Sequence, residues 1–145
     1  MTILITFLLV IVIDQLTKYL VVENFALGET MPLLENIFHF TYVRNRGAAF
    51  GILQGQQWFF IVVTIIVLAA IIIFYKELPL HNMWNRIALG LAIGGAIGNL
   101  IDRLRLGYVI DFIDLRVWPV FNIADSSVVV AVAIFSYWLL IIDSK

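Results

Sequence analysis

The chain has 145 residues, of which 63% are hydrophobic and only 13% are charged, and its formal net charge is −1. A water-soluble domain is about half apolar, so this composition predicts an integral membrane protein, and the small net charge argues against a nucleic-acid partner. The absence of cysteine excludes disulfides and thiolate metal ligands, and the two histidines, His39 and His81, belong to no metal-binding motif. We therefore expect neither a metal nor a cofactor.

Four apolar segments are candidates for membrane-spanning helices, which need about 20 residues each. They cover residues 3–22, 58–75, 84–101 and 124–142. The first segment has no basic residue before its apolar stretch and no small-residue cleavage site after it, so we predict a retained helix rather than a cleaved signal peptide. Four spans put both ends of the chain on the same side of the membrane.

The connections between these helices differ in length, and the two long ones must share a membrane face. Residues 76–83 form a short connection, whereas residues 23–57 and 104–123 form long ones. Each long connection contains an alternating, strand-like segment, at Ile37–Val43 and Tyr108–Leu115. The predicted fold is an all-α membrane protein of one domain, with four transmembrane helices and a small β platform formed by the two long loops.

The positive charges do not decide which face carries the long loops. Six of the nine lysines and arginines lie on the long-loop face and three on the other. The positive-inside rule by itself would make the long loops cytoplasmic. Several of these arginines stand beside aspartates, however, and a structural arginine does not report topology, so the charge count leaves the orientation open.

Carboxylates and amides gather near the facing ends of the third and fourth predicted helices. Charged groups close to hydrocarbon cost roughly 2.5–3.5 kcal/mol each, so they need partners or a function. Two pairs repeat one spacing, Asn99 with Asp102 and Asn122 with Asp125, in which an amide stands three residues before an acid. On a helix such side chains share a face, so each amide is predicted to hydrogen-bond its own acid.

The aspartates separate into two groups by the basic residues near them in the sequence. Four have such a residue within four positions: Asp14 has Lys18, Asp102 has Arg103 and Arg105, Asp114 has Arg116, and Asp143 has Lys145. Only Asp111 and Asp125 have none. An unpaired carboxylate in apolar surroundings has a raised pKa, and two such groups brought together share one proton. This is the arrangement with which an aspartic protease activates water.

Other interpretations of these residues stay open from spacing alone. Asp111 could be an exposed loop residue, while Asp125 only caps the last helix. The acids could also belong to an ion or proton pathway, although they cluster at one end of the helices and a transporter places its site near the midplane. Ser126 or Ser127 could form a serine–lysine dyad with Lys18.

Small residues line one face of the third helix. Gly90, Gly94, Gly98 and Asp102 follow each other at intervals of four, which places them on one side of a helix. Small residues at this spacing let another helix approach closely. The face is predicted either to pack against the first or fourth helix, or to form a groove in which a substrate helix lies.

Four blocks of the sequence resemble the lipoprotein signal peptidase family, also called signal peptidase II, in their order and spacing. The blocks are Asp14-Gln-Leu-Thr-Lys18; Arg44-Asn45-Arg-Gly47-Ala-Ala-Phe50-Gly; Gly94-Gly-Ala-Ile-Gly98-Asn99-Leu-Ile-Asp102-Arg103, continuing to Gly107-Tyr-Val-Ile-Asp111-Phe112; and Phe121-Asn122-Ile-Ala-Asp125-Ser126. Together they extend over nearly the whole chain and are highly specific.

The resemblance implies a bacterial aspartic endopeptidase that removes the signal peptide from diacylglyceryl-modified prolipoproteins, cutting just before the lipidated cysteine without a metal. It implies that Asp111 and Asp125 are catalytic, in agreement with their lack of neighbouring cations. Positions in the same blocks are expected to bind substrate or support the pair: Asp14, Lys18, Asn45, Gly47, Gly94, Gly98, Asn99, Asp102, Arg103 and Asn122. Asp102 is expected to be held by an arginine and is the second candidate for the first catalytic acid.

The resemblance also implies a location and partners. The protein is expected in the bacterial cytoplasmic membrane with both termini cytoplasmic and the active site on the extracytoplasmic face, which overrides the charge count. Its expected partners are prolipoproteins, membrane lipid and globomycin-type inhibitors. The apolar signal helix of the substrate is predicted to lie on the glycine face of the third helix. Four aromatic side chains of the first long loop are predicted to clamp the lipidated segment: Phe38, Phe40, Tyr42 and Phe50.

Overall fold

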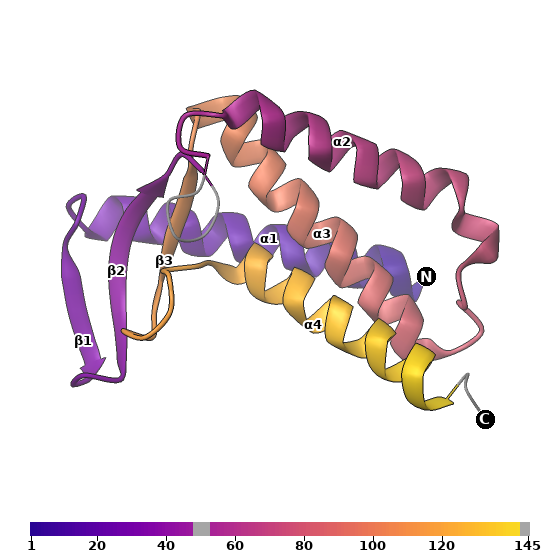
Figure 1. Ribbon diagram of the computed structural model, residues 1–145. Helices are drawn as coiled ribbons and strands as arrows, with labels where there is room; N and C mark the ends of the chain where they lie inside the picture. The colour runs from indigo at the N-terminus through magenta and orange to yellow at the C-terminus, as the bar shows by residue number, and fades with distance from the viewer. Residues whose placement is uncertain (48–52, 143–145) are drawn as a thin grey trace.

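A computed structural model describes residues 1–47 and 53–142 and shows a mostly helical protein with a small sheet at one end of the helices (Figure 1). The elements in chain order are α1 (Thr2–Asn24), β1 (Thr30–Leu34), β2 (Phe38–Asn45), α2 (Gln57–Ile73), the 3₁₀ turn η2 (Tyr75–Glu77), α3 (Met83–Leu106), β3 (Val109–Asp114), α4 (Ile123–Tyr137) and the π turn η3 (Trp138–Ile142). Each predicted membrane segment contains a helix, and both predicted strand segments are strands.

The outer surfaces of the helices are apolar and exposed. Leu4 and Val12 of α1 and Ile66 of α2, for example, each expose more than half of their surface. In water the outer face of a helix is polar, so these faces suit contact with lipid. α1, α3 and the segment Ile123–Ile141 are long and apolar enough to cross a membrane. α2 is apolar but has only 17 residues, so the fourth crossing stays a prediction.

The glycines of α3 lie where neighbouring helices come closest. A Cβ atom added to Gly90 would lie 2.7 Å from Cβ of Thr6, and one added to Gly94 would lie 2.8 Å from Cβ of Val10. The glycine face is therefore covered by α1, because small residues let two helix backbones approach each other. The predicted substrate groove on this face is wrong, and the alternative prediction of helix packing is correct.

The sheet has the strand order β1-β2-β3 with antiparallel pairing throughout. β2 and β3 come from the two long connections, so the two loops do combine in one sheet. β1 could not be predicted because it is an edge strand that contains Pro32 and whose five residues are all exposed. Such a strand has no alternation of buried and exposed positions for the sequence to display.

One face of the sheet packs on the end of α1. The buried residues of this small core are Val21, Tyr42, Ile110 and Phe112. Tyr42 is only 2% exposed. Its side chain packs in the core between the sheet and α1, so the prediction that it clamps a substrate is wrong. Phe50, another residue of the predicted clamp, lies outside the described residues.

Two short connections bring the polar residues together. Directly after α3, Gly107 has a φ of 82°, a left-handed conformation that glycine adopts without strain. The chain then reverses into β3, where pairing with β2 sets Val43 opposite Asp111. α4 starts after the loop that follows β3, with Asp125 in its first turn. The two aspartates therefore belong to different elements that meet at the sheet end of the helices (Figure 1).

Candidate active site

Asp111 and Asp125 line one cavity of about 360 Å³. Asp111 lies in the middle of β3 and is 2% exposed, and Asp125 in α4 is partly buried. Asn45, Asn99 and Arg103 line the same cavity. The structure thus brings together the two aspartates that have no basic neighbour in the sequence, and the alternative in which Asp111 is an exposed loop residue is wrong.

Two amides hold the carboxylate of Asp111. Nδ2 of Asn45 donates to Oδ2 at 2.9 Å, and Nδ2 of Asn122 donates to Oδ1 at 2.7 Å. Burial raises the pKa of Asp111 to about 7, and the charge of Asp125 adds to this rise. The two amide hydrogen bonds and the charge of Lys18 oppose the rise without cancelling it. Asp111 therefore exchanges a proton near neutral pH.

A capping box fixes Asp125 at the start of α4. Oδ1 of Asn122 accepts a hydrogen bond from the backbone N–H of Asp125 at 2.9 Å, and Oδ2 of Asp125 accepts one from the backbone N–H of Asn122 at 3.2 Å. The N-cap is thus Asn122 rather than Asp125. The predicted hydrogen bond between the Asn122 amide and Asp125 therefore exists, but it joins the amide oxygen to the backbone of Asp125, whereas the amide NH₂ donates to the carboxylate of Asp111.

The amide of Asn99 binds an acid on another helix. Its Nδ2 donates to Oδ1 of Asp125 at 2.7 Å, whereas Asp102, its predicted partner, receives no hydrogen bond from it. Its Oδ1 accepts hydrogen bonds from Lys18 at 3.0 Å and from Asn122 at 3.1 Å. The two amides are therefore bonded to each other, and each donates to one of the two aspartates.

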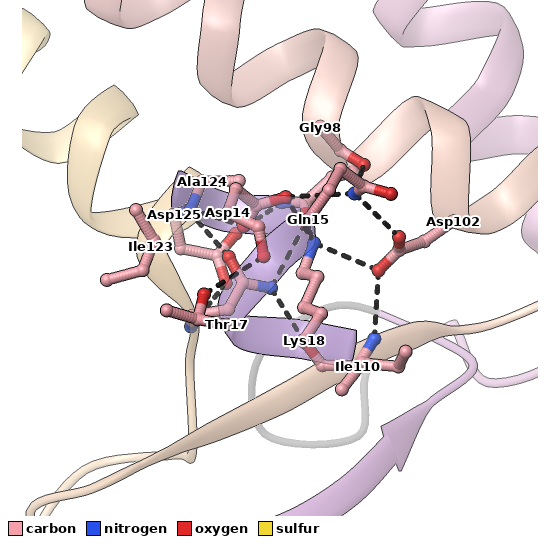
Figure 2. Close-up of polar contacts among 12 residues, drawn as sticks. Asp14, Gln15, Thr17, Lys18, Gly98, Asp102, Ile110, Ile123, Ala124 and Asp125 are labelled. Atoms are coloured by element: carbon pink, nitrogen blue, oxygen red, sulfur yellow. Dashed lines mark hydrogen bonds and ion pairs between the residues drawn. The ribbon is translucent and has the colours of Figure 1, made fainter. Parts of the chain in front are cut away.

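Lys18 lies in a buried ion cluster beside this site (Figure 2). Its Nζ is 2.9 Å from Oδ2 of Asp14, which confirms the predicted i,i+4 pair, and 2.9 Å from Oδ2 of Asp102. The prediction that an arginine holds Asp102 is wrong, because the cation paired with Asp102 is Lys18 of α1. Gly98 makes room for the cluster: a Cβ there would lie 2.6 Å from Oδ2 of Asp14.

Arg103 supplies a cation to the cavity itself. Its guanidinium lies over the ring of Phe60 at 5.1 Å from the centroid, and its backbone oxygen accepts a hydrogen bond from Gln57 at 2.8 Å. Within the described ranges, 1–47 and 53–142, no carboxylate lies within ion-pair distance of this guanidinium. The N–H donors of Arg103 are therefore available to a molecule in the cavity.

A turn at the end of β2 orients Asn45. Its Oδ1 accepts a hydrogen bond from the backbone N–H of Gly47 at 2.9 Å, which leaves Nδ2 to donate to Asp111. Gly47 is buried and also lines the cavity. Both residues predicted from this block thus lie at the site.

The serine–lysine alternative does not match the geometry. The hydroxyl of Ser126 donates to the backbone oxygen of Asn122, and that of Ser127 donates to the backbone oxygen of Ile123. The three N–H groups of Lys18 are directed at Asp14, Asp102 and Asn99. Lys18 and the two serines thus bind different partners among the residues that the structure describes, so the serine–lysine interpretation is wrong.

Gln15 is a site residue that the sequence analysis missed. Its Nε2 lies 3.1 Å from Oδ2 of Asp14, 3.1 Å from Oδ1 of Asp102 and 3.3 Å from the backbone oxygen of Gly98 (Figure 2). Its position directly after Asp14, inside an apolar helix, is the signal that could have revealed it.

Two acids that form no ion pair among the described residues and are held by amides at one end of apolar helices match the arrangement expected of a membrane-bound aspartic protease. The model of the signal peptidase (SPase) II family matches residues 6–141 of the chain. The lipoprotein signal peptidases of Halothermothrix orenii and Moorella thermoacetica are each 49% identical to it, over 132 and 134 residues, which is 91% and 92% of this chain and 90% and 89% of theirs. The chain belongs to the signal peptidase II family and is an aspartic endopeptidase.

Solved structures agree with this relationship. Two structures described as bacterial membrane enzymes superpose on the chain with TM-scores of 0.90 and 0.87, at 37% and 36% sequence identity. They cover 96% and 97% of this chain, which in turn covers 87% and 94% of theirs. The resemblance read from the four sequence blocks is confirmed, and the transporter alternative is wrong.

Proposed function

We propose that Asp111 and Asp125 are the catalytic pair with which this signal peptidase removes the signal peptide from a prolipoprotein. One observation carries the proposal: these two carboxylates share a cavity and are held by amides, and neither forms an ion pair in the part of the chain that the structure describes. An aspartic protease needs two such groups that share one proton.

The chemistry follows from this shared proton. The ionised acid of the pair removes a proton from a water molecule, whose oxygen attacks the carbonyl carbon of the scissile peptide bond. The protonated acid donates its proton to the developing oxyanion, and collapse of the tetrahedral intermediate transfers a proton to the departing amine. The pKa of about 7 for Asp111 makes one shared proton available at neutral pH.

The surroundings support Asp111 rather than Asp102 as the first acid. The carboxylate of Asp102 is 2.9 Å from the Lys18 ammonium and accepts further hydrogen bonds from Gln15 and from the backbone N–H of Ile110. It does not line the cavity. A carboxylate so engaged, outside the cavity, has no access to a water molecule that attacks substrate.

The cavity also indicates where substrate lies. Its walls include Phe60 of α2, Arg103 of α3 and Val129 of α4. A second cavity of about 410 Å³ also contains Asp125 in its lining, together with mainly apolar residues such as Trp118 and Val130. Since α1 covers the glycine face, we place the signal helix between α2 and α4, with the diacylglyceryl group beside Asp125.

The proposed membrane arrangement places this end of the molecule at the extracytoplasmic surface of the bacterial inner membrane. Four helices cross, both termini are cytoplasmic, and the sheet lies as a platform on the outer surface beside the lipid. The exposed apolar side chains of α1, α2 and α4 support it, as do the positions of Asp111 in β3 and of Asp125 in the first turn of α4. A globomycin-type inhibitor would occupy the cavity that contains Asp111 and Asp125.

A cleavage assay on purified protein in detergent tests the proposal. The substrates are a diacylglyceryl prolipoprotein and the same precursor without lipid, and the enzymes are wild type and Asp125→Asn. We expect wild type to cut only the lipidated precursor and folded Asp125→Asn to cut neither. Turnover by Asp125→Asn would overturn the catalytic pair, and equal cutting of both precursors by wild type would overturn the lipid requirement.

A further inference from the structure

Lys18 is completely engaged in hydrogen bonds, although it does not line the catalytic cavity. Its side chain is 2% exposed, and Nζ lies 2.9 Å from Oδ2 of Asp14, 2.9 Å from Oδ2 of Asp102 and 3.0 Å from Oδ1 of Asn99. An ammonium group has three N–H donors, so each donor has one acceptor. The lysine therefore has a fixed place between α1 and α3 and no remaining donor for a substrate.

Two of these acceptors continue to the backbone beside the catalytic pair (Figure 2). Oδ1 of Asp14 accepts a hydrogen bond at 3.0 Å from the backbone N–H of Ala124, the residue before Asp125. Oδ2 of Asp102 accepts one at 3.1 Å from the backbone N–H of Ile110, the residue before Asp111. The two counter-ions of one lysine thus anchor the two chain segments that carry the catalytic acids.

The third acceptor fixes the orientation of an amide at the site. Because the Lys18 ammonium can only donate, the Asn99 amide must present Oδ1 to it and Nδ2 to Oδ1 of Asp125. Rotating the amide by half a turn would set its NH₂ against the ammonium and its oxygen against the carboxylate. Lys18 therefore selects the amide orientation that donates to Asp125.

We propose that Lys18 is a positioning residue that sets the separation and orientation of Asp111 and Asp125 through these three contacts. The inference rests on the proposed catalytic pair. Without the ammonium, the carboxylates of Asp14 and Asp102 would face each other in a buried space with no cation between them, and they would move apart. The segments that begin at Ile110 and Ala124 would move with them.

The first test replaces Lys18 by methionine, which has similar length and no charge. Misplacement of catalytic groups by about 1 Å costs about 10²-fold in rate. We expect kcat of Lys18→Met on the lipidated precursor to fall about 10²-fold, with KM nearly unchanged because Lys18 does not touch substrate. The matched control is Asn85→Ala on α3, the helix that packs against α1, which loses the hydrogen bond from a fully buried amide to the backbone oxygen of Pro79. The control should melt at lower temperature with unchanged kcat.

A pH profile separates positioning from general destabilisation. The charged groups around the pair are Asp14 on α1, Asp102 and Arg103 on α3, and the two acids themselves on β3 and α4. Lys18 is the cation that compensates Asp14 and Asp102, so Lys18→Met leaves a net negative field and moves the kcat profile to higher pH. A ¹³C-carboxyl titration of Asp111 should move in the same direction, and this readout does not require turnover.

Lys18→Arg covers the case in which the methionine variant does not fold. The guanidinium keeps the charge, but its planar donors cannot serve two carboxylates and an amide arranged around one nitrogen. We expect a folded protein with kcat lowered about tenfold. A folded Lys18→Met or Lys18→Arg with wild-type kcat, pH profile and Asp111 titration would overturn the proposal. If wild type itself fails to cut while the Asp111 titration moves in Lys18→Met, the catalytic assignment fails and the positioning contact stands.

Discussion

Two pairs of aspartates lie within one polar region of this protein, and they differ in whether a cation stands between them. Asp14 and Asp102 are both 2.9 Å from the same ammonium, that of Lys18. Asp111 and Asp125 accept hydrogen bonds from amides and, for Asp125, from a backbone N–H, and form no ion pair in the part of the chain that the structure describes. Burial is similar in three of the four, at 0%, 3% and 2% exposure for Asp14, Asp102 and Asp111. Burial therefore does not separate the two pairs, whereas the presence or absence of a paired ammonium does.

The largest expected effect comes from removing one acid from each pair. Asp111→Asn deletes a group that transfers a proton, and we expect kcat on the lipidated precursor to fall by about 10³-fold or more. Asp102→Asn keeps an oxygen for the backbone N–H of Ile110, so kcat should fall by about tenfold or less. Steady-state cleavage with thermal melts as the folding control measures both. An equal fall in kcat for the two variants would contradict the proposed functional difference between the two pairs.

Stability should change in the opposite order. Asp102→Asn weakens a buried ion pair with Lys18, and we expect a loss on the order of 3 kcal/mol in the free energy of unfolding. Denaturation in mixed micelles, followed by circular dichroism, measures this loss. Asp111→Asn breaks no ion pair, so its free energy of unfolding near pH 5 should be close to that of wild type. A more stable Asp102→Asn would mean that Lys18 does not need this counter-ion.

The pH dependence of stability gives a further difference. The pKa of Asp111 is about 7 in the folded protein against an ordinary value of 3.8, so between these values the folded state binds a proton that the unfolded state lacks. Stability from this group therefore falls as pH rises from about 4 to 7, by at most about 4 kcal/mol. The melting temperature of Asp111→Asn should therefore rise relative to that of wild type as pH rises from 5 to 8. A constant difference between the two would contradict the raised pKa.

The smallest expected effect concerns a third acid, Asp114, which lies outside both pairs. Burial raises its pKa, but hydrogen bonds from the Thr41 hydroxyl and from Arg116 outweigh burial and lower the pKa below its usual value. Thr41→Val removes the 2.7 Å hydrogen bond to Asp114 and should cost about 1 kcal/mol of stability, with kcat unchanged at neutral pH. Loss of activity in Thr41→Val would show that the sheet, and not only its catalytic strand, takes part in the reaction.

Much of the fold could be predicted from the sequence because membrane helices and buried strands leave clear patterns. The four apolar segments are helices, and the alternation around Phe40 and around Asp111 marks two strands. The edge strand β1 leaves no such pattern. The sequence could not show which helix packs on the glycine face of α3. Small residues have the same spacing whether the partner is α1 or a substrate helix.

The site could be predicted in its members but not in its hydrogen bonds. Sorting the aspartates by nearby basic residues found Asp111 and Asp125, because an acid without a local cation is visible in the sequence. The same sorting assigned Asp102 to an arginine, whereas its partner Lys18 lies on another helix. Likewise, the spacing of Asn99 and Asp102 suggested a local hydrogen bond, yet Asn99 donates across to α4. Contacts between elements depend on how the helices pack against each other, and residue spacing within one helix carries no information about that packing.

The most direct measurement is a titration of the aspartate carboxyl groups by ¹³C NMR in the wild-type protein, with Asp111 assigned by comparison with Asp111→Asn. If burial and the charge of Asp125 act on a carboxylate without a cation, the Asp111 signal will titrate near pH 7. If Asp111 instead titrates near its ordinary value of 3.8, it is not the proton-sharing member of a catalytic pair, and the division of the aspartates by Lys18 is wrong.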